Sequence, residues 1–304
     1  MLYDISPIEV DKISSQLLQD RDIEISIVRL DKIHPVLSGN KLFKLYYFLQ
    51  ACQETSQRTI LTFGGAYSNH LVATAFACNK LGYKSIGIVR GEEAPHPSHS
   101  LTICREYGME LEFIPRHRYR QKDDPYFITT LMEKFGSFTL VPEGGYHPLG
   151  AKGASLITPL LDKDYTHIYS AVGTATTIAG ILLSSPQQLK IFGVTALKNM
   201  KDIGQRIAYL TENKFDGTRL TILDNYHFGG YAKHSSELIS FMNDLYRDYA
   251  IETDFVYTSK MMYAVFDSVK KGLLPSGSKV ACLHTGGLQG NLSLPVNTLD
   301  FTNV

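Results

Sequence analysis

From about residue 58 onward, short runs of β-branched and apolar residues alternate with stretches of helical periodicity. The first unit joins the run at 58–63 to the run at 84–89 through residues 70–81, whose apolar side chains recur every three or four positions. No hairpin signal separates the two runs, so a right-handed parallel crossover is expected. Continued over most of the chain, this alternation predicts an α/β protein whose parallel sheets are covered by helices.

The alternation is interrupted once, in a glycine-rich break at Glu143–Gly153. We interpret this break as a crossing between two lobes, each a mainly parallel open sheet flanked by helices. The basic, proline-containing segment 115–125 is expected to be a surface loop, because acidic residues follow its basic ones at once. Further strands are predicted at 111–114, 137–141, 166–172, 189–196, 219–224 and 278–284.

The composition excludes several classes of function. Thirty basic residues balance thirty acidic ones, so no net charge attracts the chain to nucleic acid or to an anionic membrane. No run approaches the roughly 20 apolar residues of a membrane span, and the first residues lack the basic-then-apolar order of a signal peptide. The four cysteines are scattered, which indicates neither a disulfide framework nor a zinc site. We expect a soluble cytoplasmic protein without a metal, a nucleic-acid partner or a membrane.

Three polar turns that contain glycine each follow a predicted strand, at 64–70, 173–177 and 284–287. Open parallel sheets bind ligands beyond the carboxyl ends of their strands, so these turns are expected to surround a site. The turn at 173–177 opens a helical stretch with small residues and hydroxyls, which suits an anion. An ordinary threonine-capped helix start explains that turn equally well.

Other ligand-binding patterns fail on particular residues. The dinucleotide pattern G-x-G-x-x-G is absent, and residues 145–150 have P-loop glycine spacing but are followed by Ala151 where lysine is required. Ser68 follows a predicted strand, but the hydrolase pattern G-x-S-x-G is absent. His96 and His99 lie close in sequence without the cysteine or carboxylate companions of a metal site.

The segment Ser38-Gly39-Asn40-Lys41 stands at the head of the helical stretch 41–53. A lysine in this place could hold an aldehyde cofactor as a Schiff base. That reaction needs a neutral amine, so the lysine must be desolvated or lie near other positive charge. Taken alone, Gly-Asn-Lys is more commonly a surface lysine at a helix start.

Six segments together resemble the pyridoxal-phosphate enzymes of the 1-aminocyclopropane-1-carboxylate deaminase/D-cysteine desulfhydrase family, which have the tryptophan synthase β-like fold (fold type II). They follow the family's order over residues 38–290, and they are SGNKLFKL, GGAYSNH, VPEGGYHPLGAKG, VGTATTIAG, TDFVYTSKMMYAV and LHTGGLQG. The chain departs from the family's patterns at Ser38, Phe43, Tyr67 and Ala175. The resemblance implies a large cofactor-binding domain (1–45 plus 146–304), a small domain (46–145) and a homodimer.

The resemblance also assigns cofactor contacts by position. Lys41 would carry pyridoxal phosphate as a Schiff base and, once released, move protons at the substrate Cα. Asn69 would hydrogen-bond the 3′-oxygen, Tyr257 would stack on the ring, and Thr285 would pair with the ring nitrogen. The phosphate would be held by Gly173, Thr174, Ala175, Thr176 and Thr177.

Substrate contacts are implied in the same way. Ser68, with the adjacent Asn69 and His70, would hold the substrate carboxylate, and Tyr231 matches a family tyrosine near the substrate. The segment around Tyr231, NYHFGGYAK, departs from the family's Y-x-G-x-G-Y-G.

Two positions favour one reaction over another. Thr258 stands where the cyclopropane deaminases have glutamate, so the ring nitrogen should be less protonated and the electron sink weaker. Asn69 precedes His70 as in the desulfhydrases. Both favour β-elimination on D-cysteine or another small D-amino acid, giving pyruvate, ammonia and sulfide. The alternatives are deamination of 1-aminocyclopropane-1-carboxylate to 2-oxobutanoate and ammonia, and a pyridoxal-phosphate-binding protein without turnover.

Overall fold

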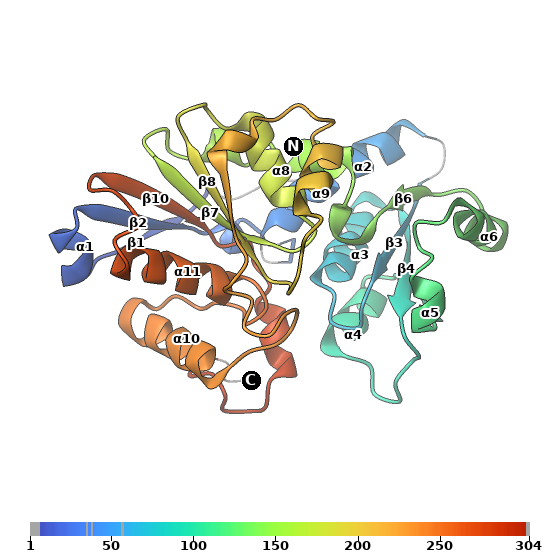
Figure 1. Ribbon diagram of the computed structural model, residues 1–304. Helices are drawn as coiled ribbons and strands as arrows, with labels where there is room; N and C mark the ends of the chain where they lie inside the picture. Colours follow the sequence, from blue (N-terminus) through green and yellow to red (C-terminus); the bar gives the residue numbers. More distant parts are fainter. Residues whose placement is uncertain (1–6, 35, 38, 56–57, 302–304) are drawn as a thin grey trace.

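The computed structural model describes residues 7–34, 36–37, 39–55 and 58–301. Two β-sheets stand side by side, each with helices packed against it (Figure 1). The larger sheet has six strands in the order β1-β2-β10-β7-β8-β9, and all its neighbours are parallel except β1 and β2. Its strands are β1 (Val10–Ile13), β2 (Ile23–Val28), β7 (His167–Val172), β8 (Lys190–Thr195), β9 (Leu220–Leu223) and β10 (Ser278–Leu283).

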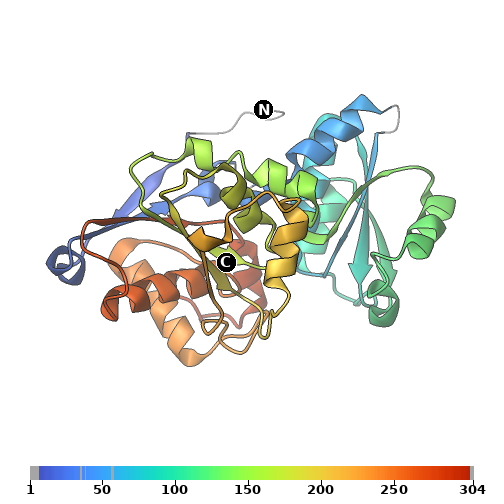
Figure 2. The same ribbon diagram turned by 45° about the horizontal axis from the view of Figure 1, so that its top comes forward.

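The smaller sheet is wholly parallel, with four strands in the order β5-β4-β3-β6. Its strands are β3 (Thr59–Gly64), β4 (Lys84–Arg90), β5 (Glu110–Ile114) and β6 (Thr139–Val141). The helices next to these strands in sequence are α3 (Asn69–Leu81), α4 (His99–Glu106), α5 (Arg116–Tyr119) and α6 (Pro125–Phe135). The view in Figure 2 shows the same four-stranded sheet between its helices.

Side chains of the larger sheet alternate between two cores, as the two-residue period of a strand requires. In β7, Ile168 and Val172 join the core that contains α2 (Asn40–Glu54) and α8 (Thr176–Ser184), whereas Tyr169 and Ala171 face the core of α11 (Thr258–Lys270). Both faces are therefore covered, and all six residues of β7 are buried. The remaining helices are α1 (Gln16–Asp20), α7 (Pro148–Ala154), α9 (Ile203–Leu210) and α10 (Ser236–Tyr249).

Glycines allow three helices beside the candidate site to pack unusually close together. A Cβ on Gly153 of α7 would lie 2.0 Å from the carbonyl oxygen of Phe43 in α2, and one on Gly180 of α8 would lie 2.6 Å from the carbonyl oxygen of Ala151. Only glycine permits these approaches. The stack of α2, α7 and α8 therefore fixes the first turn of α2 above the start of α8.

The predicted α/β class with two mainly parallel sheets is confirmed, and each predicted strand overlaps a strand of the structure. The antiparallel β1 and its partner β2 were not predicted. The segment 115–125, predicted to be a loop, contains the single helical turn α5, and its Tyr119 is buried beneath it. Ser38, one of the departures from the family pattern, lies outside the described residues.

Candidate active site

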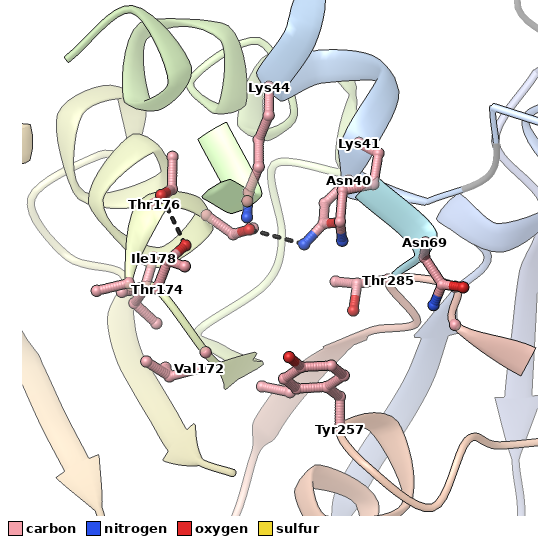
Figure 3. A pocket seen from close by; sticks show the side chains of 17 residues that line it. Asn40, Lys41, Lys44, Asn69, Val172, Thr174, Thr176, Ile178, Tyr257 and Thr285 are labelled. Carbon is pink, nitrogen blue, oxygen red and sulfur yellow. Dashed lines mark hydrogen bonds between the residues drawn. The ribbon is translucent and has the colours of Figure 1, made fainter. Parts of the chain in front are cut away.

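A pocket of about 560 Å³, open solvent included, lies beyond the carboxyl ends of β7 and β10. These two strands are neighbours in the six-stranded sheet, so their following turns meet at one edge. The start of α2, Gly144 after β6, the start of α3 and the start of α11 complete the lining (Figure 3). Two of the three polar turns predicted to form a site thus reach the pocket along most of their length, and the third reaches it through Asn69.

Lys41 reaches the pocket because Gly39 allows the chain to pass against the turn after β10. Gly39 has a φ of +73°, and a Cβ there would lie 1.9 Å from the carbonyl oxygen of Thr285. Lys41 is partly buried, and its Nζ donates a hydrogen bond of 2.7 Å to Oδ1 of Asn40. The amide nitrogen of Asn40 donates in turn to Oγ1 of Thr177 at 2.8 Å, which ties the lysine to the start of α8.

The electrostatics of the pocket favour a neutral amine at Lys41. Burial lowers the pKa of Lys41 to about 8, although the negative charge of Asp254 acts in the opposite direction. Burial is the effect that an imine-forming lysine requires, because only the unprotonated amine attacks an aldehyde.

A second lysine, Lys44, lies one helical turn after Lys41 and is 5% exposed. Figure 3 shows its side chain extended toward the start of α8, in the direction of Thr176. Burial and the charge of Lys41 lower its pKa well below the usual value. Sequence reasoning did not assign this residue, although its spacing of three from Lys41 on a helix places both on one face.

The turn predicted to suit an anion lies at the amino end of α8, and all of residues 173–177 line the pocket. Ala175 holds a left-handed φ of 68° at the helix cap, and Oγ1 of Thr174 lies 2.9 Å from Oγ1 of Thr176. A Cβ on Gly173 would lie 3.1 Å from the ring of Tyr257. The first N–H groups of a helix lack partners within it, so this turn offers an anion several donors and a positive dipole end.

Tyr257 forms the aromatic wall of the pocket at the start of α11 (Figure 3). Its backbone N–H donates to Oδ2 of Asp254 at 2.8 Å, and the same carboxylate accepts from the N–H and the hydroxyl of Thr258 at 2.8 and 2.6 Å. Thr258 is fully buried, and its hydroxyl, which is bound to Asp254, is not part of the pocket lining. Thr285 faces the pocket and is 8% exposed.

The turn after β3 carries the predicted substrate contacts Ser68, Asn69 and His70. Asn69 lines the pocket, and its buried Oδ1 has no hydrogen-bond partner among the described residues. Ser68 is not part of this lining, and its Oγ accepts a hydrogen bond of 3.3 Å from the N–H of Leu71 as the cap of α3.

His70 points away from the pocket and is buried against β3. Its Nε2 lies 2.9 Å from Oγ1 of Thr62, which donates its hydroxyl proton to the carbonyl of Val141. Nε2 must therefore carry the proton of that hydrogen bond. Burial and the charges of Lys41 and Lys44 lower the pKa of His70 to about 3, so the ring is neutral.

Tyr231 stands at the mouth of the pocket and is 50% exposed. Its ring centre lies 6.1 Å from that of Tyr257, with the two planes at 65°. The structure thus brings Tyr231 beside the site, but the residues that line the pocket do not include it.

The residues present fit pyridoxal phosphate. Lys41 supplies an amine poised to be neutral, the start of α8 a cradle for the phosphate, and Tyr257 a flat wall for the ring. The unpartnered Asn69 Oδ1 is a buried polar atom that a bound group would satisfy. A parallel α/β fold with this site defines the class of protein as a pyridoxal-phosphate enzyme.

Comparison with known proteins agrees with this class. The model of the family of pyridoxal-phosphate dependent enzymes matches residues 11–286, so the chain belongs to that family. A putative 1-aminocyclopropane-1-carboxylate deaminase of Pyrococcus abyssi is 27% identical over 90% of this chain and 88% of the relative. The mitochondrial bifunctional D-cysteine desulfhydrase/1-aminocyclopropane-1-carboxylate deaminase of Arabidopsis thaliana is 28% identical over 88% of this chain and 73% of the relative. The solved structure of an ACC deaminase homologue superposes with a TM-score of 0.79 at 24% identity, covering 94% of this chain and 91% of that one.

In the described part of the chain, no group of three or more histidine, cysteine or acidic side chains is arranged to hold a metal ion. None of the helices described is both long enough and apolar enough to cross a membrane.

Proposed function

We propose that this protein is a pyridoxal-phosphate-dependent lyase that eliminates the thiol from a small D-amino acid such as D-cysteine. With one water, D-cysteine gives pyruvate, ammonia and hydrogen sulfide. The observation that carries the proposal is the Lys41 amine, with its pKa lowered to about 8, beside the anion cradle that opens α8. The names of the relatives support a small amino-acid substrate.

The roles of the residues follow from their positions. Bound pyridoxal phosphate supplies an electron sink for the pair left at Cα when a proton is removed. Lys41 both anchors the cofactor and, when free, accepts the Cα proton at Nζ. The turn at 173–177 and Lys44 hold the phosphate, and the charge of Lys44 is then balanced by an anion.

Thr285 sets how strongly the ring withdraws electrons, and Tyr257 stacks on its face. A hydroxyl at Thr285 donates or accepts a hydrogen bond but carries no charge, so it stabilises a protonated ring nitrogen less than a carboxylate does. Such a sink suffices to expel a thiol, which leaves readily as an anion. An electron sink of this strength therefore favours elimination over the opening of a cyclopropane ring.

The substrate contacts are proposed to lie on the turn after β3. Ser68 and the backbone at Asn69 and His70 would hold the substrate carboxylate, since their turn leads directly into the start of α3. Tyr231 would face the substrate side chain from the mouth of the pocket. His70 contributes through its backbone only, because its ring is turned toward Thr62.

The second candidate is deamination of 1-aminocyclopropane-1-carboxylate, which the name of the Pyrococcus relative gives alone and that of the Arabidopsis relative gives beside D-cysteine desulfhydration. Incubating purified holoprotein with D-cysteine, L-cysteine and the cyclopropane acid distinguishes the two candidate reactions. Elimination on cysteine gives pyruvate, whereas deamination of the cyclopropane acid gives 2-oxobutanoate. We expect pyruvate and sulfide from D-cysteine, and none from a Lys41→Arg variant. Release of 2-oxobutanoate alone would establish the second candidate, and the absence of any keto acid would reject both.

The proposal also includes the domain division, the oligomeric state and the cellular location of the protein. The division into a large domain (1–45 plus 146–304) and a small domain (46–145) is supported by the separation of the strands into two sheets, although residue 45 falls within α2. The homodimer rests on the family resemblance and the cytoplasmic location on the sequence. Sedimentation velocity of the holoprotein and fractionation of cells test these two.

A further inference from the structure

The segment that carries Tyr231 has an unusual backbone. Between β9 and α10, Phe228, Gly229, Gly230 and Ala232 all have positive φ, at 49°, 93°, 117° and 52°. Side-chain-bearing residues rarely adopt this conformation, because their Cβ crowds the backbone. Two hydrogen bonds of 3.0 Å within the segment, from the N–H of Gly229 to Nδ1 of His227 and from the N–H of Gly230 to the His227 carbonyl, hold part of this shape. Further contacts come from outside the segment.

Those contacts come from one face of α11. That face is formed by residues spaced three or four positions apart, and each of them contacts the segment. They are residues 257, 260, 263 and 267. Figure 1 shows α11 lying between the six-stranded sheet and α10. The side-chain pairs are Tyr257 with Tyr231, Tyr263 with Phe228 (ring centres 5.0 Å apart), and Asp267 with the hydroxyl of Tyr226 (2.5 Å).

Lys260 makes the contact at the middle of this face, and this contact requires a charged group to be buried. The residue is 1% exposed, and its Nζ donates to the carbonyl oxygens of His227 and Gly230, both at 2.8 Å. No carboxylate of the described residues forms an ion pair with it. Burial lowers its pKa to about 8, against the opposing charge of Asp254.

A methionine would fill a similar volume without the cost of burying charge. What a methionine cannot do is hold two carbonyl groups together. The two carbonyls that Lys260 holds flank the turn immediately before Tyr231, so the ammonium group fixes where that tyrosine leaves the segment.

We propose that Lys260 is a positioning residue, which pins the carbonyls of His227 and Gly230 and thereby sets the ring of Tyr231 against Tyr257 at the mouth of the cofactor pocket. The consequence for turnover rests on the proposed function, in which Tyr231 faces the substrate. The consequence for the segment itself does not.

Hydrogen–deuterium exchange of the holoprotein, resolved by peptide, tests the structural part. In Lys260→Met we expect the amides of residues 226–232 to exchange at least tenfold faster, with the rest of α11 unchanged. The matched control is Met262→Leu, a fully buried position of the same helix whose side chain packs in the core of the six-stranded sheet, and it should leave this segment unaffected. If Lys260→Met does not fold, Lys260→Gln takes its place, because it retains one donor without charge. Unchanged exchange at 226–232 in a folded variant overturns the proposal.

A double-mutant cycle tests the part that concerns catalysis. We expect Lys260→Met to lower kcat for D-cysteine about tenfold in the wild-type background and less than twofold when Tyr231→Ala is already present, because coupled residues lose their effect together. Cofactor content, measured by absorbance, should stay the same. Equal losses in both backgrounds would assign Lys260 a merely structural role. If the wild-type protein turns over no substrate, the proposed function fails, and the exchange experiment still decides the role of Lys260.

Discussion

The lowered pKa of Lys41 makes a quantitative prediction for how the apoprotein captures pyridoxal phosphate. An ordinary lysine has a pKa of 10.5, and burial in the pocket lowers that of Lys41 to about 8. The difference corresponds to about 3 kcal/mol against the charged form. At pH 7 about one Lys41 side chain in ten is therefore neutral, compared with about one in three thousand for an exposed lysine.

Stopped-flow absorbance of apoprotein mixed with excess pyridoxal phosphate measures this directly. The rate constant of the covalent step should rise about tenfold per pH unit up to pH 8 and then level off. After borohydride reduction, peptide mass spectrometry should find the cofactor on Lys41.

Two variants on the same helix make the prediction specific. Lys41→Arg retains positive charge but has no amine to react, so it should abolish the adduct. Lys44→Arg should keep the adduct, because the proposed phosphate partner remains cationic. A rate that continues to rise beyond pH 10, or an adduct on Lys44, would refute the assignment of Lys41.

Three changes elsewhere in the fold test the energetics. Gly153→Ala places a Cβ 2.0 Å from the carbonyl oxygen of Phe43 and should lower the free energy of unfolding in urea by about 3 kcal/mol. Ala250→Gly, at the left-handed cap of α10 where φ is 54°, should raise it by about 1 kcal/mol, and no gain would mean that this conformation is not strained. For Lys260, the folded pKa of about 8 lies below its ordinary 10.5, so burial opposes the folded state below pH 8 and this cost disappears toward pH 10.5. Wild type should therefore gain up to about 3 kcal/mol relative to Lys260→Met over that pH range, and a parallel dependence in the two proteins would contradict the buried charge.

The parts of the site that follow strands could be predicted because local signals mark them. The turn at 173–177 combines small residues with hydroxyls between a strand and a helix, and the structure places all of it in the pocket. Gly39 illustrates why a short pattern was informative. A glycine is required at position 39 by a contact with Thr285, which lies far away in sequence. That contact brings Lys41 to the site.

The residues that escaped prediction depend on contacts between distant segments. Lys44 looks like an ordinary lysine of an amphipathic helix until α7 and α8 bury it. Lys260 lies in one of the segments that resemble the family, but no role was predicted for it. Nothing local in the sequence indicates that the carbonyls of residues 227 and 230 accept its hydrogen bonds. The family resemblance placed His70 beside the substrate, but the helical direction of α3 carries its ring toward β3 and Thr62.

Thr258 shows how a single position must be interpreted together with its partners. In the sequence alone, Thr258 is a neutral group at the position where the cyclopropane deaminases have glutamate. In the fold its hydroxyl is bound to Asp254, which also accepts from the backbone of Val256 and Tyr257. A glutamate at this position would bring a second carboxylate into a fully buried cap that already holds one, and like charges without a partner are expensive there. Thr258→Glu alone should therefore destabilise the start of α11, and with it the Tyr257 wall, before it could make the ring nitrogen more basic. Thr285, the proposed partner of the ring nitrogen, lines the pocket and is consequently the better position at which to test the strength of the electron sink.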